Sequence, residues 1–129
     1  EMKSKENEIR QFVEFFGKVP HKQSIKELFN ADYCIFIRDR SRKNMAGFPT
    51  KFVECFTSGI SIIANNISDI ENYFPDDEHS ILIENNTSEE ICEALNKALL
   101  AGNPTRRVNE SNPFDYRQWI DQYKIFLER

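Results

Sequence analysis

The sequence predicts an α/β fold, in the form of a Rossmann-like parallel sheet flanked by helices. Three short runs, residues 33–37, 60–64 and 80–84, are mostly apolar, as in strands covered on both faces. Segments with helical periodicity separate these runs, and strands that alternate with helices favour parallel pairing. The 129 residues suffice for one compact domain with a single core.

The first part of the chain opens on a polar stretch, residues 1–8, which is typical of a helix tail or a frayed end. β-forming residues then predict a strand near 11–16, ended by a glycine and a proline. A short helix is expected within 23–32, before the apolar strand 33–37. The apolar positions that recur at helical spacing in that helix are Ile25, Leu28 and Phe29.

The middle of the chain contains a polar loop, 38–48, followed by a predicted helix, 49–58. Pro49 suits the first turn of this helix, because its missing N–H costs nothing there. Gly59 suits the left-handed position after the last turn. The strand 60–64 comes next.

The last part of the chain begins with residues 65–74, expected to form a loop with a short helix. The clearest helix lies within 85–104, where Thr87 and Glu90 form a capping box and a glycine and a proline mark the end. A final helix begins after Pro113. The apolar face of the clearest helix is Ile91, Ala94, Leu95, Ala98 and Leu99. The final helix carries Tyr116, Trp119, Ile120, Tyr123 and Leu127 on one side.

Composition narrows the class of protein. Hydrophobic residues make up 40% and charged residues 29% of the chain, as in ordinary globular proteins. The net charge of −4 argues against nucleic acid as a partner, because phosphate binding needs a basic surface. No apolar run reaches the roughly 18 residues of a membrane span, and no signal peptide is expected. We therefore expect a cytoplasmic protein, and the first residue, Glu1, suggests a piece of something longer.

Several kinds of chemistry find little support. The number of cysteines is odd and no Cys-x-x-Cys spacing occurs, so buried reduced thiols are expected and no metal is predicted. His21 and His79 are isolated, with no nearby pattern for nucleophilic catalysis, although His21 follows a predicted strand. No cofactor is predicted and no catalytic residue is assigned. The three cysteines are Cys34, Cys55 and Cys92.

One loop offers a candidate ligand site. In open parallel sheets ligands bind at the carboxyl ends of the strands, and the loop 38–48 leaves such an end and leads into the helix 49–58. A helix N-terminus presents unpaired N–H groups and a partial positive charge, and Gly47 allows a ligand to approach the backbone. Phe48, Thr50 and Lys51 could donate to a phosphate, whereas proline has no N–H to donate.

Glu54, inside the same helix, is open to two interpretations. A carboxylate suits hydroxyl groups, such as the two hydroxyls of a ribose, better than phosphate. An exposed glutamate opposite a buried face made by Phe52, Val53 and Phe56 is equally ordinary. The cations of residues 38–43 could likewise hold a diphosphate or form a solvated loop. Asn65 and its polar neighbours could line the cleft or make turns.

The order of these motifs resembles the C-terminal, donor-binding domain of the GT-B glycosyltransferases, and more narrowly the retaining group 1 enzymes of family 4. The first stretch that carries the likeness is "VEFFGKVPHKQSIKELFNADYCIFI", and the second is "AGFPTKFVECFTSGISIIANNISDIENYF". A capped helix and a closing aromatic helix follow them. The likeness extends from about residue 9 to the end of the chain.

The resemblance implies a fold, an activity and partners. The family has two Rossmann-like domains with the active site between them, so residues 1–129 would be the nucleotide-sugar-binding domain without its first βα units. The implied reaction moves a sugar from a nucleotide-sugar to a glycan or lipid-linked acceptor with retention and without a metal, in polysaccharide biosynthesis. The acceptor would bind the missing N-terminal domain, so this fragment alone should be inactive. Peripheral membrane association of the full enzyme is compatible with this role.

The resemblance also assigns residues. Glu54 matches the second glutamate of the family's Glu-x7-Glu pair, which binds the donor ribose. Gly47, Phe48, Pro49 and Thr50 match the loop whose backbone approaches the donor sugar and diphosphate. Val19 and Pro20 match a segment that usually touches the base.

Ala46 departs from the family pattern. It stands eight residues before Glu54, where the family has its first glutamate, so that contact with the donor sugar is absent. Asn44 could replace it. The runner-up function is therefore a non-catalytic Rossmann-like module that binds a nucleotide or a protein. A response-regulator receiver is a weaker third reading, because Asp39 near a strand end has no partner acids.

Overall fold

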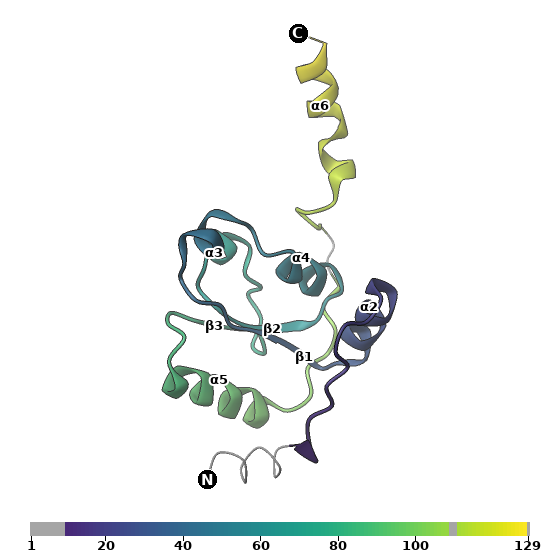
Figure 1. Ribbon diagram of the computed structural model, residues 1–129. Coiled ribbons are helices and arrows are strands. Elements are labelled where there is room, and N and C mark those ends of the chain that lie inside the picture. The colour runs from purple at the N-terminus through teal and green to yellow at the C-terminus, as the bar shows by residue number, and fades with distance from the viewer. Residues whose placement is uncertain (1–9, 109–110, 129) are drawn as a thin grey trace.

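A computed structural model of the chain describes residues 10–108 and 111–128, and it contains one parallel sheet between helices (Figure 1). The three strands are β1 (Tyr33–Phe36), β2 (Ser61–Asn65) and β3 (Ile81–Ile83), in the order β1-β2-β3. Both pairings are parallel, with Cys34 opposite Ile62 and Ala64 opposite Leu82. The α/β, Rossmann-like fold class is confirmed.

Helices connect and cover the strands. α2 (His21–Asn30) precedes β1, and α3 (Arg42–Ala46) and α4 (Thr50–Thr57) lie between β1 and β2. A 3-10 helix, η1 (Ile70–Tyr73), lies between β2 and β3. After β3 come α5 (Ser88–Ala101), a second 3-10 helix, η2 (Tyr116–Trp119), and α6 (Ile120–Leu127). In Figure 1, α4 and α5 lie on opposite sides of the sheet, and α6 projects away from it.

Alternation along the strands builds a core on each side of the sheet. Ile62 and Ala64 of β2 point to the side of α4, whereas Ile63 points to α5. All five residues of β2 are buried, because this strand lies between the other two and beneath both helical layers. The α4-side core is Leu28, Phe52, Cys55, Ile60, Ile62, Ala64, Ile67 and Ile70. The α5-side core is Ile63, Ile81, Ile83, Ala94 and Ala98.

A segment after α5, residues 103–108, runs back across the amino ends of the strands, and we call it the strap. Arg107 fastens it: its backbone N donates to Gly59 O at 2.9 Å, and its guanidinium donates to Asp77 Oδ2 at 2.8 Å and to Ile60 O at 3.2 Å. The guanidinium also lies 5.3 Å from the centre of the Phe56 ring. Burial lowers the pKa of Arg107, and the charge of Asp77 opposes that shift.

The predicted strand near 11–16 is wrong. These residues form a turn and irregular backbone, with Phe12 84% and Phe15 78% exposed. A strand needs a hydrogen-bonded neighbour, and the described sheet consists only of β1, β2 and β3. The β-forming residues 11–16 therefore have no neighbouring strand in the described sheet with which to pair. The helix tail or frayed end expected at residues 1–8 lies outside the described residues.

Three further expectations are corrected. β1 is not covered on both faces, because it is an edge strand among the described residues and Ile35 is 50% exposed. The polar loop 38–48 contains a helix, α3, because the Ser41 side chain caps it by accepting from Asn44 N. Leu99, expected on the buried face of α5, is 79% exposed. The remaining predicted helices and strands are present within a few residues of their expected bounds.

Candidate functional site

The carboxyl end of β1 leads into the segment 47–51, where sequence reasoning placed the ligand loop. Gly47 follows α3 directly, and Pro49 occupies the N-cap position of α4. No side chain caps α4, so the amides of Thr50 and Lys51 begin the helix without a side-chain acceptor. Gly47 and Thr50 are exposed. The backbone of this segment is therefore accessible to a ligand.

Phe48 and Pro49 serve the core rather than the surface. Pro49 is fully buried, and Phe48 is half-buried against an aromatic cluster. The Phe48 ring lies 5.7 Å from that of Phe52 and 5.5 Å from that of Phe114, measured between centroids. Proline has no N–H, so the backbone N–H of Phe48 is the donor that this pair offers, while both side chains pack in the core.

Glu54 is half-buried and paired with Lys51. The Lys51 ammonium lies 2.6 Å from Glu54 Oε2, and their side chains are 39% and 26% exposed. The hydrogen bond to Glu54 raises the pKa of Lys51, although burial opposes it. Sequence reasoning named both residues but missed their contact, which the spacing of opposite charges three residues apart on a helix could have indicated. The Glu54 carboxylate is thus partly accessible to solvent and already hydrogen-bonded to Lys51.

The position of Ala46 is exposed at the end of α3. Asn44, the candidate substitute for the missing glutamate, directs its amide nitrogen to Asp39, with 3.0 Å to the backbone oxygen and 2.7 Å to Oδ1. Asn44 therefore stabilises its own loop. The basic segment is also partly tied down, since Arg40 donates to Glu84 O at 3.3 Å.

Asn65 belongs to the framework of this site. It is fully buried at the end of β2. Its amide donates to Arg38 O at 2.8 Å and accepts from Arg38 N at 2.9 Å. The side chain thus replaces the backbone partner that β1 would otherwise lack beyond its last residue. Of the two roles considered, a structural one is observed, and it fixes where the basic loop leaves the sheet.

The structure does not join Val19 and Pro20 to the ligand loop. Pro20 caps α2, with its carbonyl accepting from Gln23 N at 2.9 Å and Ser24 N at 3.1 Å. In Figure 1, α2 and α3 lie on opposite sides of α4. Within the described ranges, no hydrogen bond or ion pair connects residues 19–20 with residues 47–51.

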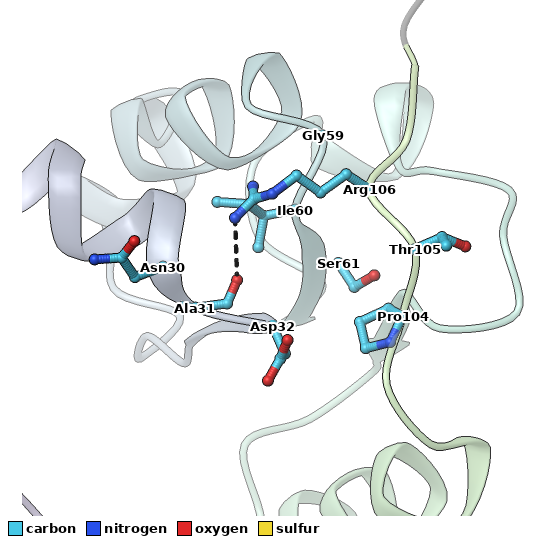
Figure 2. Close-up of a pocket in the computed structure, with 9 residues that line it drawn as sticks. All are labelled: Asn30, Ala31, Asp32, Gly59, Ile60, Ser61, Pro104, Thr105 and Arg106. Carbon is cyan, nitrogen blue, oxygen red and sulfur yellow. Dashed lines mark hydrogen bonds between the residues drawn. The ribbon is translucent and has the colours of Figure 1, made fainter.

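A hollow at the amino ends of β1 and β2 is shown in Figure 2. Arg106 closes one side of it and donates to Ala31 O at 3.5 Å, to Ser58 O at 3.3 Å and to Phe29 O. These carbonyls end α2 and α4, where a cation is favourable. The hollow measures about 120 Å³, below the roughly 300 Å³ of ordinary ligand pockets, and lies away from the strand ends where ligands bind in such sheets.

The cysteines and histidines add no reactive centre. All three cysteines are free, and a hydrogen bond to Cys34 together with burial raises the pKa of the Cys55 thiol. His21 is exposed, while His79 lies 3.3 Å from the Tyr33 hydroxyl through Nδ1. Among residues 10–108 and 111–128, no group of acidic, histidine and cysteine side chains could hold a metal, and no helix could span a membrane. Cys92 is exposed rather than buried.

A parallel α/β sheet with an accessible helix N-terminus beyond the end of β1, and a carboxylate inside that helix, offers groups that suit the phosphate and hydroxyl groups of a ligand. The sequence matches the family described as Glycosyl transferases group 1 over residues 1–113. The chain therefore belongs to the group 1 glycosyl transferases, as its motifs indicated. Neither a curated protein nor a solved structure gives a significant match.

Proposed function

We propose that this chain is the donor-binding part of a retaining glycosyltransferase that moves a sugar from a nucleotide-sugar to a glycan or lipid-linked acceptor. Membership of the group 1 family over residues 1–113 carries the proposal. The accessible Glu54 carboxylate and the exposed Gly47 backbone support it, because their chemistry fits a ribose and a diphosphate. Hexosyl transfer in polysaccharide biosynthesis and a cytoplasmic location are part of the same proposal.

In this proposal the residues of α4 bind and position the donor. Glu54 accepts hydrogen bonds from the ribose hydroxyls, and the amides of Thr50 and Lys51 stabilise negative charge on the leaving diphosphate. Phe48 and Pro49 support that backbone from below. Val19 and Pro20 would contribute from the start of α2, a different element from α4. No general base is assigned.

We further propose that the acceptor site and the first βα units belong to a preceding part of a longer polypeptide. The outer edge of β1, which has no partner strand among the described residues, supports this idea, since doubly wound sheets commonly have about six strands and β1-β2-β3 would form one half. The 129 residues alone should then bind donor but not transfer sugar. Weak membrane contact through the acceptor domain is compatible with this division.

One observation favours a second function, a non-catalytic module that binds a nucleotide or a protein. Ala46 lacks the carboxylate that the family places near the donor sugar, and Asn44, its candidate substitute, is engaged with Asp39. Such a module would bind the nucleotide and discriminate poorly between attached sugars. Transfer activity in a chain extended by the preceding domain decides between the two.

The experiment that tests donor binding is a titration of the chain with UDP-sugars and GDP-sugars, followed by NMR shifts of the backbone amides. We expect Glu54→Ala to weaken binding more than tenfold, because the ribose hydroxyls lose their acceptor. Glu93→Ala, an exposed acid on α5, is the matched control and should bind normally. Equal affinity in wild type and Glu54→Ala would sink the assignment of Glu54.

A further inference from the structure

The ion pair between Lys51 and Glu54 places a cation where helix electrostatics disfavours it. Lys51 lies in the first turn of α4, whose N-terminal end carries a partial positive charge, and that turn contains no acidic residue. The carboxylate of Glu54, three residues later, offsets this unfavourable placement, with its Oε2 atom 2.6 Å from Lys51 Nζ. Both side chains remain partly exposed, so solvent or a ligand can reach the pair.

We propose that Lys51 determines specificity at this site: it holds Glu54 while the site is empty and makes binding depend on a ligand that carries phosphate. The inference rests on the proposed function, because it concerns the same carboxylate. The ligand class is a nucleoside diphosphate or its sugar ester, as opposed to a nucleoside without phosphate.

Competition for the carboxylate gives the first half of the argument. A hydrogen bond between an ammonium and a carboxylate is roughly twice as strong as one between neutral groups. Ribose hydroxyls that approach Glu54 must share or displace the Lys51 ammonium. A bare nucleoside therefore gains little, because it replaces a charge-assisted contact with neutral donors.

The geometry of the ammonium gives the second half. Lysine has three N–H donors on a flexible stem, so Lys51 can turn toward a phosphate while it keeps one contact to Glu54. A diphosphate accepts hydrogen bonds from the ammonium, and these replace the contact to Glu54 that the ribose hydroxyls displace. Arg40 is less suited, since its guanidinium donates to Glu84 O. In this proposal, selectivity for phosphate depends on the Lys51 ammonium.

The test uses NMR titrations of the chain with uridine and UDP and, in parallel, with guanosine and GDP. For the nucleoside base that binds, we expect Lys51→Met to lower diphosphate affinity at least tenfold and to leave nucleoside affinity equal or stronger. Lys51→Arg should restore most of the preference. Lys97→Met, which removes an exposed cation from α5 on the opposite side of the sheet, is the matched control and should keep it.

Ionic strength supplies a readout that a structural role would not change. The preference of the wild type for diphosphate over nucleoside should fall as salt is raised, whereas that of Lys51→Met should stay flat. If Lys51→Met weakens nucleoside and diphosphate by the same factor, or if salt acts equally on both proteins, the proposal is wrong. If neither ligand responds to Glu54→Ala, or nothing binds the wild type, the proposed function itself fails.

Discussion

At the scale of single residues, the two positions near the ends of α4 that hold glycine do so for different physical reasons. Gly59 has φ +69°, in the left-handed region, and a Cβ there would overlap the backbone oxygen of Arg107 in the strap. Gly47 has φ −111°, and a Cβ there would make an ordinary contact 3.5 Å from Lys43 O. The fold requires Gly59, whereas only an approaching ligand would require Gly47.

This contrast gives a paired prediction. Gly59→Ala should lower the free energy of unfolding by roughly 2 to 4 kcal/mol, because it adds backbone strain and forces the strap away. Gly47→Ala should change it by less than about 0.5 kcal/mol and should weaken nucleotide-sugar binding. Urea unfolding and the NMR titration measure the two effects. Normal stability of Gly59→Ala would contradict the packing of the strap.

Tyr33 makes the free energy of unfolding depend on pH in the alkaline range. Burial, and then the charges of Asp77 and Asp32, raise the pKa of Tyr33 above 10.0, because each opposes the phenolate. Just above pH 10 the folded state therefore keeps the Tyr33 proton that the unfolded state loses. The contribution of Tyr33 to the free energy of unfolding is complete below pH 10 and is lost as pH rises through the folded pKa.

The variant Tyr33→Phe tests this dependence. We expect it to cost about 1 kcal/mol at neutral pH, where the hydroxyl contacts His79 at 3.3 Å and Ala98 O at 3.4 Å. Its unfolding free energy should then fall less than that of the wild type between about pH 9 and about pH 11. Lys51, whose raised pKa acts in the same direction, is present in both proteins and cancels. Parallel curves would rule out the Tyr33 contribution.

At the scale of elements, Phe114 attaches the C-terminal segment to the core. Its ring lies 5.2 Å from the Tyr73 ring and 5.4 Å from the Phe56 ring, between centroids. Nearby, Asn112 Nδ2 donates to Thr57 Oγ1 at 3.0 Å. η2 and α6 follow, with Tyr123 65% exposed. This one aromatic side chain therefore anchors a segment that otherwise contributes little burial.

We expect Phe114→Ala to lower the free energy of unfolding by about 2 kcal/mol, less than for a fully buried phenylalanine. Trypsin should also cut after Arg117 several times faster, because the segment opens locally more often. Tyr116→Ala, at a position that is 72% exposed, is the matched control and should change neither quantity. Unchanged cleavage in Phe114→Ala would show that other contacts hold the segment.

Local chemistry explains which elements could be predicted. The Thr87 side chain accepts from Glu90 N at 3.3 Å, as the cap motif indicates, and α5 begins where expected. The reciprocal half of the capping box does not form, because the Glu90 carboxylate accepts from Asn85 instead. The strand near 11–16 fails for a related reason: propensity is local, whereas a strand depends on a neighbour that no local pattern supplies.

For the candidate site too, local sequence motifs could be predicted, whereas contacts between distant parts of the chain could not. Gly47 and Glu54 followed from a motif within a few residues of sequence, and their exposure agrees with a ligand site. The burial of Phe48 depends on Phe114, which is far along the chain, and could not be predicted from spacing. The framework role of Asn65 depends on register between two strands, which is likewise a long-range property.

At the scale of the whole molecule, β1 is the edge strand on one side of the sheet within the residues that the structure describes. Ile35 of β1 is 50% exposed beside a shallow hollow that Leu95 and Leu99 of α5 also line. An edge strand with free backbone groups and apolar side chains favours pairing with another chain. The same edge is where further strands would complete a doubly wound sheet.

This edge leads to a last prediction. The 129-residue chain should self-associate reversibly at concentrations of about 100 μM, and Ile35→Lys should reduce the association strongly, because a lysine on an edge strand must be desolvated for pairing to occur. Leu100→Lys, at a position 89% exposed near the end of α5, is the matched control and should still associate. Sedimentation equilibrium measures the difference. A monomeric wild type at that concentration, or equal association of wild type and Ile35→Lys, would show that the β1 edge is protected in some other way. Loss of association in Ile35→Lys alone would place the contact at β1.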